Sequence, residues 1–247
     1  MEELWKNFDK IYCINLKERE DKYKYARETF ERLDIPVEFY RVDKHKSDGA
    51  QGCFESHINL IKKAWDSGCE NVLIFEDDIY PNQITFEKLK EVVGFIRNED
   101  WDIFYLGICP FFFSIPVKKQ NYKNIYRLKS NCTHAYIMNR EYMGKVKDLT
   151  FRGTPIDTFY SKNTKKTYGI FPSLFYQASF SSDISNQAIE KFKESFFHKY
   201  KPFWLNLVEY TSMNKAEILA AISLILFLVL FLIFWKKNKR REFRPLI

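Results

Sequence analysis

A short apolar segment that ends in three consecutive carboxylates is the feature that most constrains this sequence. The segment runs from Val72 to Phe75 and is followed by Glu76, Asp77 and Asp78. An apolar run of this length predicts a buried strand, so the acids are expected together at its carboxyl end, where open α/β sheets bind ligands. Three adjacent negative charges repel one another, and a divalent cation would offset that repulsion. Oxygen ligands favour Mg2+ or Mn2+ over zinc. A solvated acidic turn is the alternative interpretation.

Segments with the patterns of strands and helices alternate through the first hundred residues. Apolar runs typical of buried parallel strands are expected at residues 11–16, 37–42, 72–75 and 102–106. Between them, apolar side chains recur at spacings of three and four, which predicts amphipathic helices. These helices are expected to carry Tyr23 to Leu33, Phe54 to Trp65 and Phe86 to Ile96. The pattern predicts an α/β layer with a mostly parallel sheet.

The sequence changes character after Gly107 and becomes aromatic and rich in loops. Strands are expected at residues 124–128 and 134–138, followed by a short helix at residues 140–148. Residues 150–187 are expected to be mostly loop. We place the end of the folded domain at residue 187, which gives one domain at residues 1–187.

The net charge of +7 does not indicate a nucleic-acid-binding protein. Residues 236–247 form a basic tail with six cations and one anion, or +5, which leaves +2 for residues 1–235. The basic residues before the tail are scattered and form no stripe. Nucleic acid is therefore not an expected partner.

The five cysteines are widely spaced and contain no Cys-x-x-Cys pair. This pattern indicates neither a zinc site nor a disulfide framework. Cys13 and Cys109 lie in apolar runs and are expected to be small core residues. Cys53 is not expected to be a nucleophile, because the spacing positions no base beside it.

A run of eighteen uncharged residues at 218–235 predicts a transmembrane helix. Such a helix spans about 27 Å at about 1.5 Å per residue. The basic tail that follows favours a cytoplasmic flank, but the N-terminus has no apolar signal region that would start translocation. We therefore expect a single-pass membrane protein and leave open the side on which the domain lies. Residues 188–217 are expected to form a linker helix leading into the membrane.

Several short motifs, taken in order, resemble glycosyltransferase family 25, the group that includes bacterial lipooligosaccharide galactosyltransferases and procollagen galactosyltransferases. The resemblance runs from about residue 10 to residue 184. Its motifs are Ile-Tyr-Cys-Ile-Asn-Leu-Lys-Glu-Arg at 11–19, Gly-Cys-Phe-Glu-Ser-His at 52–57, Leu-Ile-Phe-Glu-Asp-Asp-Ile at 73–79, Trp-Asp-Ile-Phe-Tyr-Leu-Gly at 101–107, Thr-His-Ala-Tyr-Ile at 133–137, Pro-Ile-Asp at 155–157, and Gln177 with Ser-Asp-Ile at 182–184. One such motif is weak evidence, whereas seven in order are specific.

The resemblance implies a GT-A fold, an α/β sandwich that binds a nucleotide sugar through a divalent metal and transfers the sugar with inversion. It implies Mn2+ or Mg2+ as cofactor and a UDP-sugar as donor. The leaving diphosphate in such a reaction needs a cation fixed against its developing charge. We expect Asp78 and Glu76 as the metal ligands, with Asp77 or Glu76 on the ribose or on metal-bound water.

Three further residues are donor-site candidates at the same edge of the sheet. Asn15 and Arg19 follow the first strand, and by analogy the guanidinium of Arg19 would contact nucleotide or phosphate. An ion pair with a neighbouring acid is the alternative for Arg19. His57 lies near the start of the helix that precedes the acids, and its alternative is a local hydrogen-bonding role. Gly52, which precedes His57, suggests that the backbone at this point closely approaches another group.

Inversion requires a general base that takes the proton of the acceptor hydroxyl. Asp157, in the loop-rich half of the domain, is the first candidate, and Asp183 is the second. Either could instead be a capping or turn residue. His134 is expected to be structural or to shape the acceptor pocket.

The leading hypothesis is a membrane-anchored, Mn2+-dependent glycosyltransferase that adds galactose or glucose to a glycan or a hydroxylysine-type acceptor. One alternative is a catalytically inactive domain of the same fold that binds glycans or partners at the membrane. Another is a metal-dependent phosphohydrolase, because acids at strand ends also serve phosphoryl chemistry.

Overall fold

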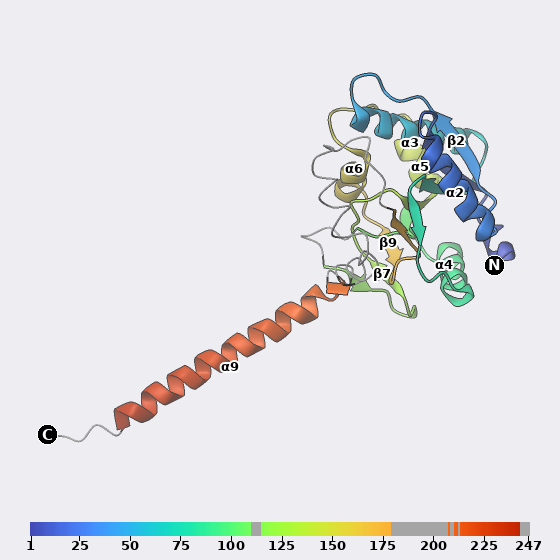
Figure 1. Cartoon of the computed structure of the whole chain (residues 1–247). Helices are drawn as coiled ribbons and strands as arrows, with labels where there is room; N and C mark the ends of the chain where they lie inside the picture. Colours follow the sequence, from blue (N-terminus) through green and yellow to red (C-terminus); the bar gives the residue numbers. More distant parts are fainter. Residues whose placement is uncertain (110–114, 179–206, 208–209, 212, 243–247) are drawn as a thin grey trace.

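A computed structural model describes residues 1–109, 115–178, 207, 210–211 and 213–242 of the chain, with side chains as far as residue 229 (Figure 1). Asp183 and most of the linker helix predicted at residues 188–217 lie outside these residues. The strands of the large sheet are β1 (Lys10–Leu16), β2 (Glu38–Val42), β3 (Asn71–Glu76), β5 (Ile103–Tyr105), β6 (Val117–Lys118), β7 (Ile125–Arg127), β8 (Ala135–Asn139) and β9 (Thr167–Ile170). A separate pair is formed by β4 (Ile79–Pro81) and β10 (Phe175–Gln177). The helices are α1 (Glu2–Trp5), α2 (Glu20–Arg32), α3 (Gly49–Asp66), α4 (Phe86–Asn98), α5 (Arg140–Val146), α6 (Ile156–Asn163) and α9 (Lys215–Glu242).

The large sheet is mixed, with the order β2-β1-β3-β8-β5-β9-β7-β6. β1 pairs in parallel with both β2 and β3, and β5 pairs in parallel with β9. β8 is inserted between β3 and β5 and runs against both, while β7 runs against β9. The predicted α/β class and mostly parallel sheet are therefore confirmed, with β8 and β7 as the strands of opposite direction.

β3 is buried on both faces, as its uninterrupted apolar sequence predicts. Leu73 and Phe75 point into one core, which contains residues of α2 and α4. Val72 and Ile74 point into the other, which contains residues of α3, α5 and α6. The alternation follows from the two-residue period of a strand, and it leaves Glu76 as the first side chain past the apolar run.

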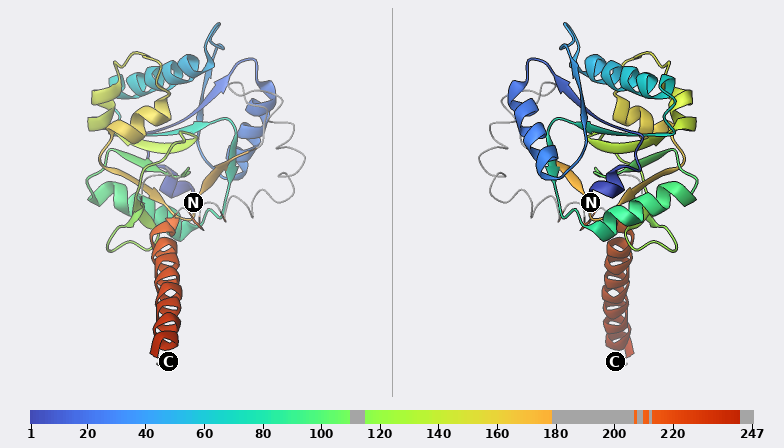
Figure 2. Two further views of the ribbon diagram at one scale, coloured as in Figure 1. Left: turned by 90° about the vertical axis from the view of Figure 1, so that its left-hand side faces the viewer. Right: turned by 90° about the vertical axis from the view of Figure 1, so that its right-hand side faces the viewer.

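The carboxyl ends of β1 and β3 define the edge of the sheet that matters for function. The chain leaves β1 through α2 to reach β2 on one side, and it reaches β3 on the other side through α3. Figure 2 shows α2 and α3 on different sides of β1. In open α/β sheets, ligands bind at the strand ends where two successive connections run to opposite sides of the first strand. The register that pairs Ile14 with Glu76 places the end of β1 beside the acids.

The segment from residue 150 to residue 178 is more regular than predicted. It contains α6, β9 and β10, so the expectation of mostly loop was wrong. Ile156 and Tyr160, one helical turn apart, are buried, and all four residues of β9 are buried. Tertiary burial thus stabilises elements that are too short to give a clear periodic signal.

Gly52 lies inside α3, not in a loop before it. The helix begins at Gly49, where the side chain of Asp48 accepts hydrogen bonds from the backbone N–H groups of Ala50 and Gln51. A Cβ at position 52 would lie 2.7 Å from Cβ of His45. The close backbone approach that we expected at Gly52 is therefore an approach to His45 of this chain.

The expectation about the cysteines was wrong in one respect. Cys109 and Cys132 form a disulfide between the segment after β5 and the segment before β8, so Cys109 is not a free core residue. Cys13 is free and fully buried, as predicted. The large sequence separation of 23 residues hid the pairing, since spacing alone does not reveal which cysteines meet.

α9 extends away from the domain (Figures 1 and 2). It runs from Lys215 to Glu242 and so includes residues 218–235 and the first part of the basic tail. Within the described part of the chain, no helix combines the length and apolarity that a membrane crossing requires. The transmembrane helix predicted at residues 218–235 is therefore not confirmed, and the side chains of its residues 230–235 lie outside those described.

Candidate functional site

Glu76, Asp77 and Asp78 lie where the sequence predicted them, at the carboxyl end of β3. Glu76 is the last residue of the strand, and the two aspartates form the turn into β4. All three are largely shielded from solvent, with 23%, 10% and 18% of their side chains exposed. Their partners are therefore protein groups, and the alternative of a solvated acidic turn does not fit this burial.

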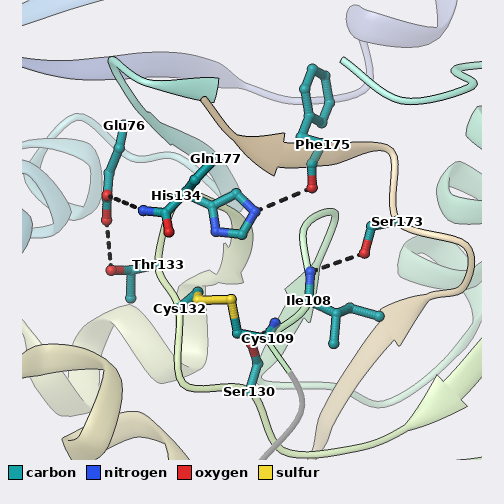
Figure 3. Close-up of a disulfide and its surroundings, with 10 residues drawn as sticks. All are labelled: Glu76, Ile108, Cys109, Ser130, Cys132, Thr133, His134, Ser173, Phe175 and Gln177. Atoms are coloured by element: carbon teal, nitrogen blue, oxygen red, sulfur yellow. Dashed lines mark hydrogen bonds between the residues drawn. A yellow bond between two sulfur atoms is a disulfide. The ribbon is translucent and has the colours of Figure 1, made fainter. Parts of the chain in front are cut away.

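Glu76 is held by side chains from three other segments of the chain. Its Oε1 accepts a hydrogen bond of 2.7 Å from the hydroxyl of Thr133 and lies 3.6 Å from Nε2 of His57. The side-chain amide of Gln177 lies 3.5 Å from the other carboxylate oxygen (Figure 3). Burial acts to raise the pKa of Glu76, but the imidazole of His57 and the hydrogen bond from Thr133 outweigh it and hold that pKa at about 2. Glu76 is therefore ionised at neutral pH.

His57 lies beside Glu76, and its role in a donor site stays a prediction. Its ring is 1% exposed and lies between Glu76 and the hydroxyl of Tyr136, which is 2.9 Å from Nδ1. The hydroxyl and the carboxylate together fix the orientation of the ring. His57 is therefore a positioned partner of Glu76.

Asp77 is fixed by Asn15, the candidate from β1. Nδ2 of Asn15 donates a hydrogen bond of 2.7 Å to Asp77, and Oδ1 of Asn15 accepts one of 3.0 Å from Arg41 on β2. Burial raises the pKa of Asp77 to about 6, although the nearby Lys22 ammonium and the hydrogen bond from Asn15 act in the opposite direction. Burial therefore disfavours the charged form of Asp77 more than Lys22 and Asn15 favour it.

Lys22 of α2 is the counter-ion of the two aspartates. Its Nζ lies 3.5 Å from Oδ1 of Asp77 and 3.2 Å from Oδ2 of Asp78, and its side chain is 8% exposed. Burial lowers the pKa of Lys22, but the charges of Asp78 and Asp77 outweigh this effect and raise it. This contact could not be predicted from local patterns, because Lys22 and the acids are far apart along the chain.

Asp78 keeps one oxygen without a partner. Its Oδ1 is buried and has no hydrogen-bond donor among the described residues. Burial and the neighbouring charge of Glu76 raise the pKa of Asp78. A buried, unsatisfied carboxylate oxygen is costly, and a cation would satisfy it. Carboxylate oxygens are ligands that suit a hard divalent cation, and the assignment of Asp78 and Glu76 as metal ligands stays a prediction.

Arg19 makes the ion pair that its alternative interpretation predicted. Nε and one terminal nitrogen donate to the two carboxylate oxygens of Asp21, at 3.0 and 2.8 Å. The guanidinium fork is therefore occupied by a carboxylate in this structure, and a contact between Arg19 and nucleotide stays a prediction.

Asp157 lies in the first turn of α6 and not in a loop. Its Oδ1 accepts a hydrogen bond from the backbone N–H of Thr158, the next residue, while the N-cap of α6 is Pro155. Burial, and then the charges of Glu76, Asp157 and Asp78, raise the pKa of the Cys53 thiol. Asp157, Glu76 and Asp78 are thus close enough to act on one common side chain, and that side chain is unsuited to form a thiolate nucleophile.

Sequence reasoning missed four side chains that complete the site. Lys22 supplies the compensating charge, Thr133 holds Glu76, Tyr136 orients His57, and Arg41 orients Asn15. Thr133 and Tyr136 belong to the motif at 133–137, so their presence was visible but their roles were not. Their contacts depend on β8 lying beside β3, and this pairing cannot be read from local periodicity.

A family model described as glycosyltransferase family 25 (LPS biosynthesis protein) matches residues 40–160. The resemblance to family 25 is confirmed. The matched segment contains His57, the acidic triplet and Asp157, whereas Asn15, Arg19 and Lys22 precede it.

The family 25 relatives include two procollagen galactosyltransferases. Procollagen galactosyltransferase 1-A of Xenopus laevis is 25% identical over 130 residues, which cover 41% of this chain and 21% of the relative. Procollagen galactosyltransferase 2 of Homo sapiens is 26% identical over 129 residues, which cover 40% of this chain and 21% of the relative. The chain thus spans about a fifth of the length of these relatives.

Solved structures give a weaker likeness. The galactosyltransferase LgtC in complex with donor and acceptor sugar analogues is 11% identical, with 75% of this chain and 94% of that chain covered and a TM-score of 0.39. A197 from STIV is 13% identical, with 67% and 82% covered and the same TM-score.

Proposed function

We propose that this chain is a metal-dependent, inverting glycosyltransferase of GT-A type that moves a hexose, galactose or glucose, from a UDP-sugar to a hydroxyl of a glycan or a hydroxylysine-type acceptor. The match to family 25 and its procollagen galactosyltransferase relatives support the reaction class and the choice of hexose. The geometry at the end of β3 supports the place where the donor binds.

The observation that carries the proposal is the buried, unpartnered Oδ1 of Asp78 in a turn whose other carboxylates are already held by protein groups. Burying a carboxylate oxygen without a donor is unfavourable unless a ligand completes the site. The turn lies beside the carboxyl ends of β1 and β3, the edge at which α/β sheets bind nucleotides.

Each residue of the site has a separate role in this proposal. A bound Mn2+ or Mg2+ would stabilise the charge that develops on the leaving diphosphate. Asp78 and Glu76 would hold the cation, and Thr133 and His57 keep Glu76 ionised and oriented. Asp77 is fixed by Asn15 for a hydrogen bond to the ribose or to metal-bound water. Lys22 adds a positive charge that also favours phosphate.

Asp157 is proposed as the general base. It lies at the start of α6, within electrostatic range of Cys53, as Glu76 and Asp78 do. A carboxylate in that place can take the proton of an acceptor hydroxyl as the hydroxyl attacks the sugar. Asp183, the second candidate, lies outside the described residues.

A second candidate function is favoured by one specific observation. Lys22 already compensates the charges of Asp77 and Asp78 at 3.5 and 3.2 Å, and an internal ammonium can replace a metal ion in a site that no longer catalyses transfer. Under this alternative the chain is a binding module of the same fold that holds nucleotide or glycan without turnover.

Attachment to a membrane through residues 218–235 is a separate part of the proposal. The described apolar side chains of α9 are exposed to solvent, with Leu224 59% and Phe227 64% exposed. Such a surface is unfavourable in water and suits a lipid environment. Extraction of membranes at alkaline pH tests it: an anchored chain stays in the pellet, and release into the supernatant would contradict the attachment.

The reaction is tested by measuring nucleotide release from UDP-galactose, UDP-glucose and other UDP-sugars with the full chain in detergent, with and without Mn2+. We expect one donor to be turned over only with metal, and Asp78→Asn to abolish release. Asp148→Asn, which changes an exposed surface carboxylate paired with lysines, is the control and should leave release unchanged. Binding of UDP with metal but no turnover of any donor would favour the binding module. Release of inorganic phosphate without sugar transfer would favour a phosphohydrolase.

A further inference from the structure

The disulfide between Cys109 and Cys132 lies beside a histidine that none of the roles above uses. His134 is two residues beyond Cys132 and is 1% exposed (Figure 3). One ligand atom from each of the three residues lies within 4.8 Å of the other two. In the part of the chain that the structure describes, this is the one group of three or more such side chains so close together.

The hydrogen bonding of His134 leaves one ring nitrogen available. Nε2 lies 3.2 Å from the carbonyl oxygen of Phe175, which can only accept, so Nε2 carries the proton. Nδ1 is then the acceptor nitrogen, and it is buried with no hydrogen-bond partner among the described residues. Figure 3 shows this nitrogen on the side of the ring that faces the disulfide. Burial also lowers the pKa of His134, which keeps the ring neutral.

This arrangement has the chemistry of a thiophilic metal site. Histidines that bind metals through one ring nitrogen usually donate the other N–H to a carbonyl or carboxylate, as Nε2 does to Phe175. Two thiolates and a neutral imidazole form a three-ligand set for tetrahedral Zn2+ that leaves one position for water. Two thiolates, a neutral imidazole and Zn2+ together carry no net charge. Burying this site therefore leaves no uncompensated charge in the protein interior.

We propose that Cys109, Cys132 and His134 form a redox-controlled zinc site, in which a disulfide links the two cysteines in the oxidised protein and Zn2+ links all three residues in the reduced protein. A dithiol reductant supplies the two electrons: it becomes a disulfide, the bond between the two Sγ atoms breaks, and each sulfur takes a proton. Zn2+ then displaces the two thiol protons, which pass to solvent. The zinc position is distinct from the acidic triplet, which offers only oxygen ligands.

The site would keep one loop in place in both redox states. Residues 130–134 carry Thr133, which donates to Glu76, and Ser130, whose hydroxyl accepts from the backbone N–H of Cys109. Either the disulfide or the metal ties this loop to the end of β5. The acid site of the protein would therefore remain assembled in an oxidising or a reducing compartment, provided that zinc is present in the latter.

The test uses the full chain, reduced with a phosphine or left oxidised, and titrated with Co2+ as a spectroscopic substitute for Zn2+. We expect the reduced protein to bind one Co2+ with a thiolate-to-cobalt charge-transfer band and the strong visible absorption of tetrahedral cobalt. Zn2+ should displace the Co2+, and the oxidised protein should show neither band. His134→Ala should weaken Co2+ binding by more than about tenfold, since it removes a ligand and not only an outer partner.

Controls separate this site from other thiols of the chain. Cys69→Ser and Cys53→Ser change cysteines that are free in the structure, and they should leave the charge-transfer band intact, whereas Cys109→Ser should abolish it. Persistence of the band in Cys109→Ser, or its absence from the reduced parent protein, would overturn the proposal. If His134→Ala does not fold, alkylation of the reduced parent protein with and without Zn2+ replaces that variant. Zn2+ should protect Cys109 and Cys132 from alkylation and should not protect Cys53. Equal labelling of Cys109 and Cys132 with and without Zn2+ would refute the site.

Discussion

Nζ of Lys22 on α2 lies 3.2 Å from Oδ2 of Asp78 in the turn after β3. The contact joins the helix that follows the first strand to the acids that end the third strand. The same Nζ lies 3.5 Å from Oδ1 of Asp77. Three charges, two negative and one positive, are thereby buried together. The remaining negative charge and the unpartnered Oδ1 of Asp78 are what a divalent cation would complete.

Lys22→Met is expected to destabilise the protein. Removing the partner of a buried charge pair costs about 3 kcal/mol or more, and here it leaves two aspartates without their ammonium. The loss in free energy of unfolding, measured by urea denaturation at pH 7, should shrink at pH 5, where the aspartates can take up protons. Lys24→Met, on the exposed side of the same helix, is the matched control. Equal stabilities of the two variants would show that the ion pair contributes nothing.

The pH dependence of stability should carry the signature of Asp77. Because its folded pKa is about 6, above the ordinary value of 3.8, the folded state holds the proton more tightly than the unfolded state. Stability therefore falls as the pH rises from about 4 to about 6, by up to about 3 kcal/mol from this group. In Asp77→Asn that fall should be smaller, with the part due to the raised pKa of Asp78 remaining, and saturating Mn2+ should reduce it in the parent protein. Parallel profiles for the two proteins over this range would contradict the assignment.

Glu76 should behave in the opposite way. Its pKa of about 2 lies below the ordinary value of 4.5, so its stabilising effect is complete above pH 4.5 and is lost as the pH falls through 2. Thr133→Val removes a hydrogen bond to the carboxylate and should cost about 1 to 3 kcal/mol at pH 7, while Thr133→Ser, which keeps the hydroxyl, should restore most of it. Failure of serine to restore stability would show that the methyl packing, and not the hydrogen bond, is what matters.

Two glycines give a contrast that tests the packing around His134. A Cβ at Gly107 would lie 1.9 Å from Nε2 of His134 and 2.7 Å from the carbonyl oxygen of Phe175, so Gly107→Ala should be strongly destabilising. Gly94 lies within α4 with nothing near its Cβ position, and Gly94→Ala should stabilise by about 0.5 to 1 kcal/mol. Thermal unfolding of both variants provides the comparison, and similar melting temperatures would contradict this packing.

Much of the fold and part of the site could be predicted from the sequence, and particular residues show why. The run from Val72 to Phe75 predicted a buried strand and therefore the common position of the three acids, because strand burial is a local property of the sequence. The partners of those acids were not predicted. Thr133 reaches Glu76 only because β8 inserts antiparallel between β3 and β5, and Lys22 reaches Asp78 only because α2 packs back on the sheet.

The other features that the sequence did not predict also depend on contacts between distant parts of the chain. The strand at Thr167–Ile170 is short and buried on both faces, so it has no alternation to detect. The disulfide between Cys109 and Cys132 joins distant segments, and Gly52 is explained by contact with His45. In each case a tertiary contact, not a local pattern, decides the structure.

Asp78 and its neighbours are proposed to bind a nucleotide through a divalent cation. Calorimetric titration of UDP into the full chain, with Mn2+ present or chelated, tests it most directly when the parent protein is compared with Asp78→Asn. We expect binding of UDP to the parent protein only in the presence of Mn2+, and a loss of at least about tenfold in affinity in Asp78→Asn, equivalent to about 1.4 kcal/mol. Binding of UDP that is equally tight without metal, or unchanged in Asp78→Asn, would contradict the account.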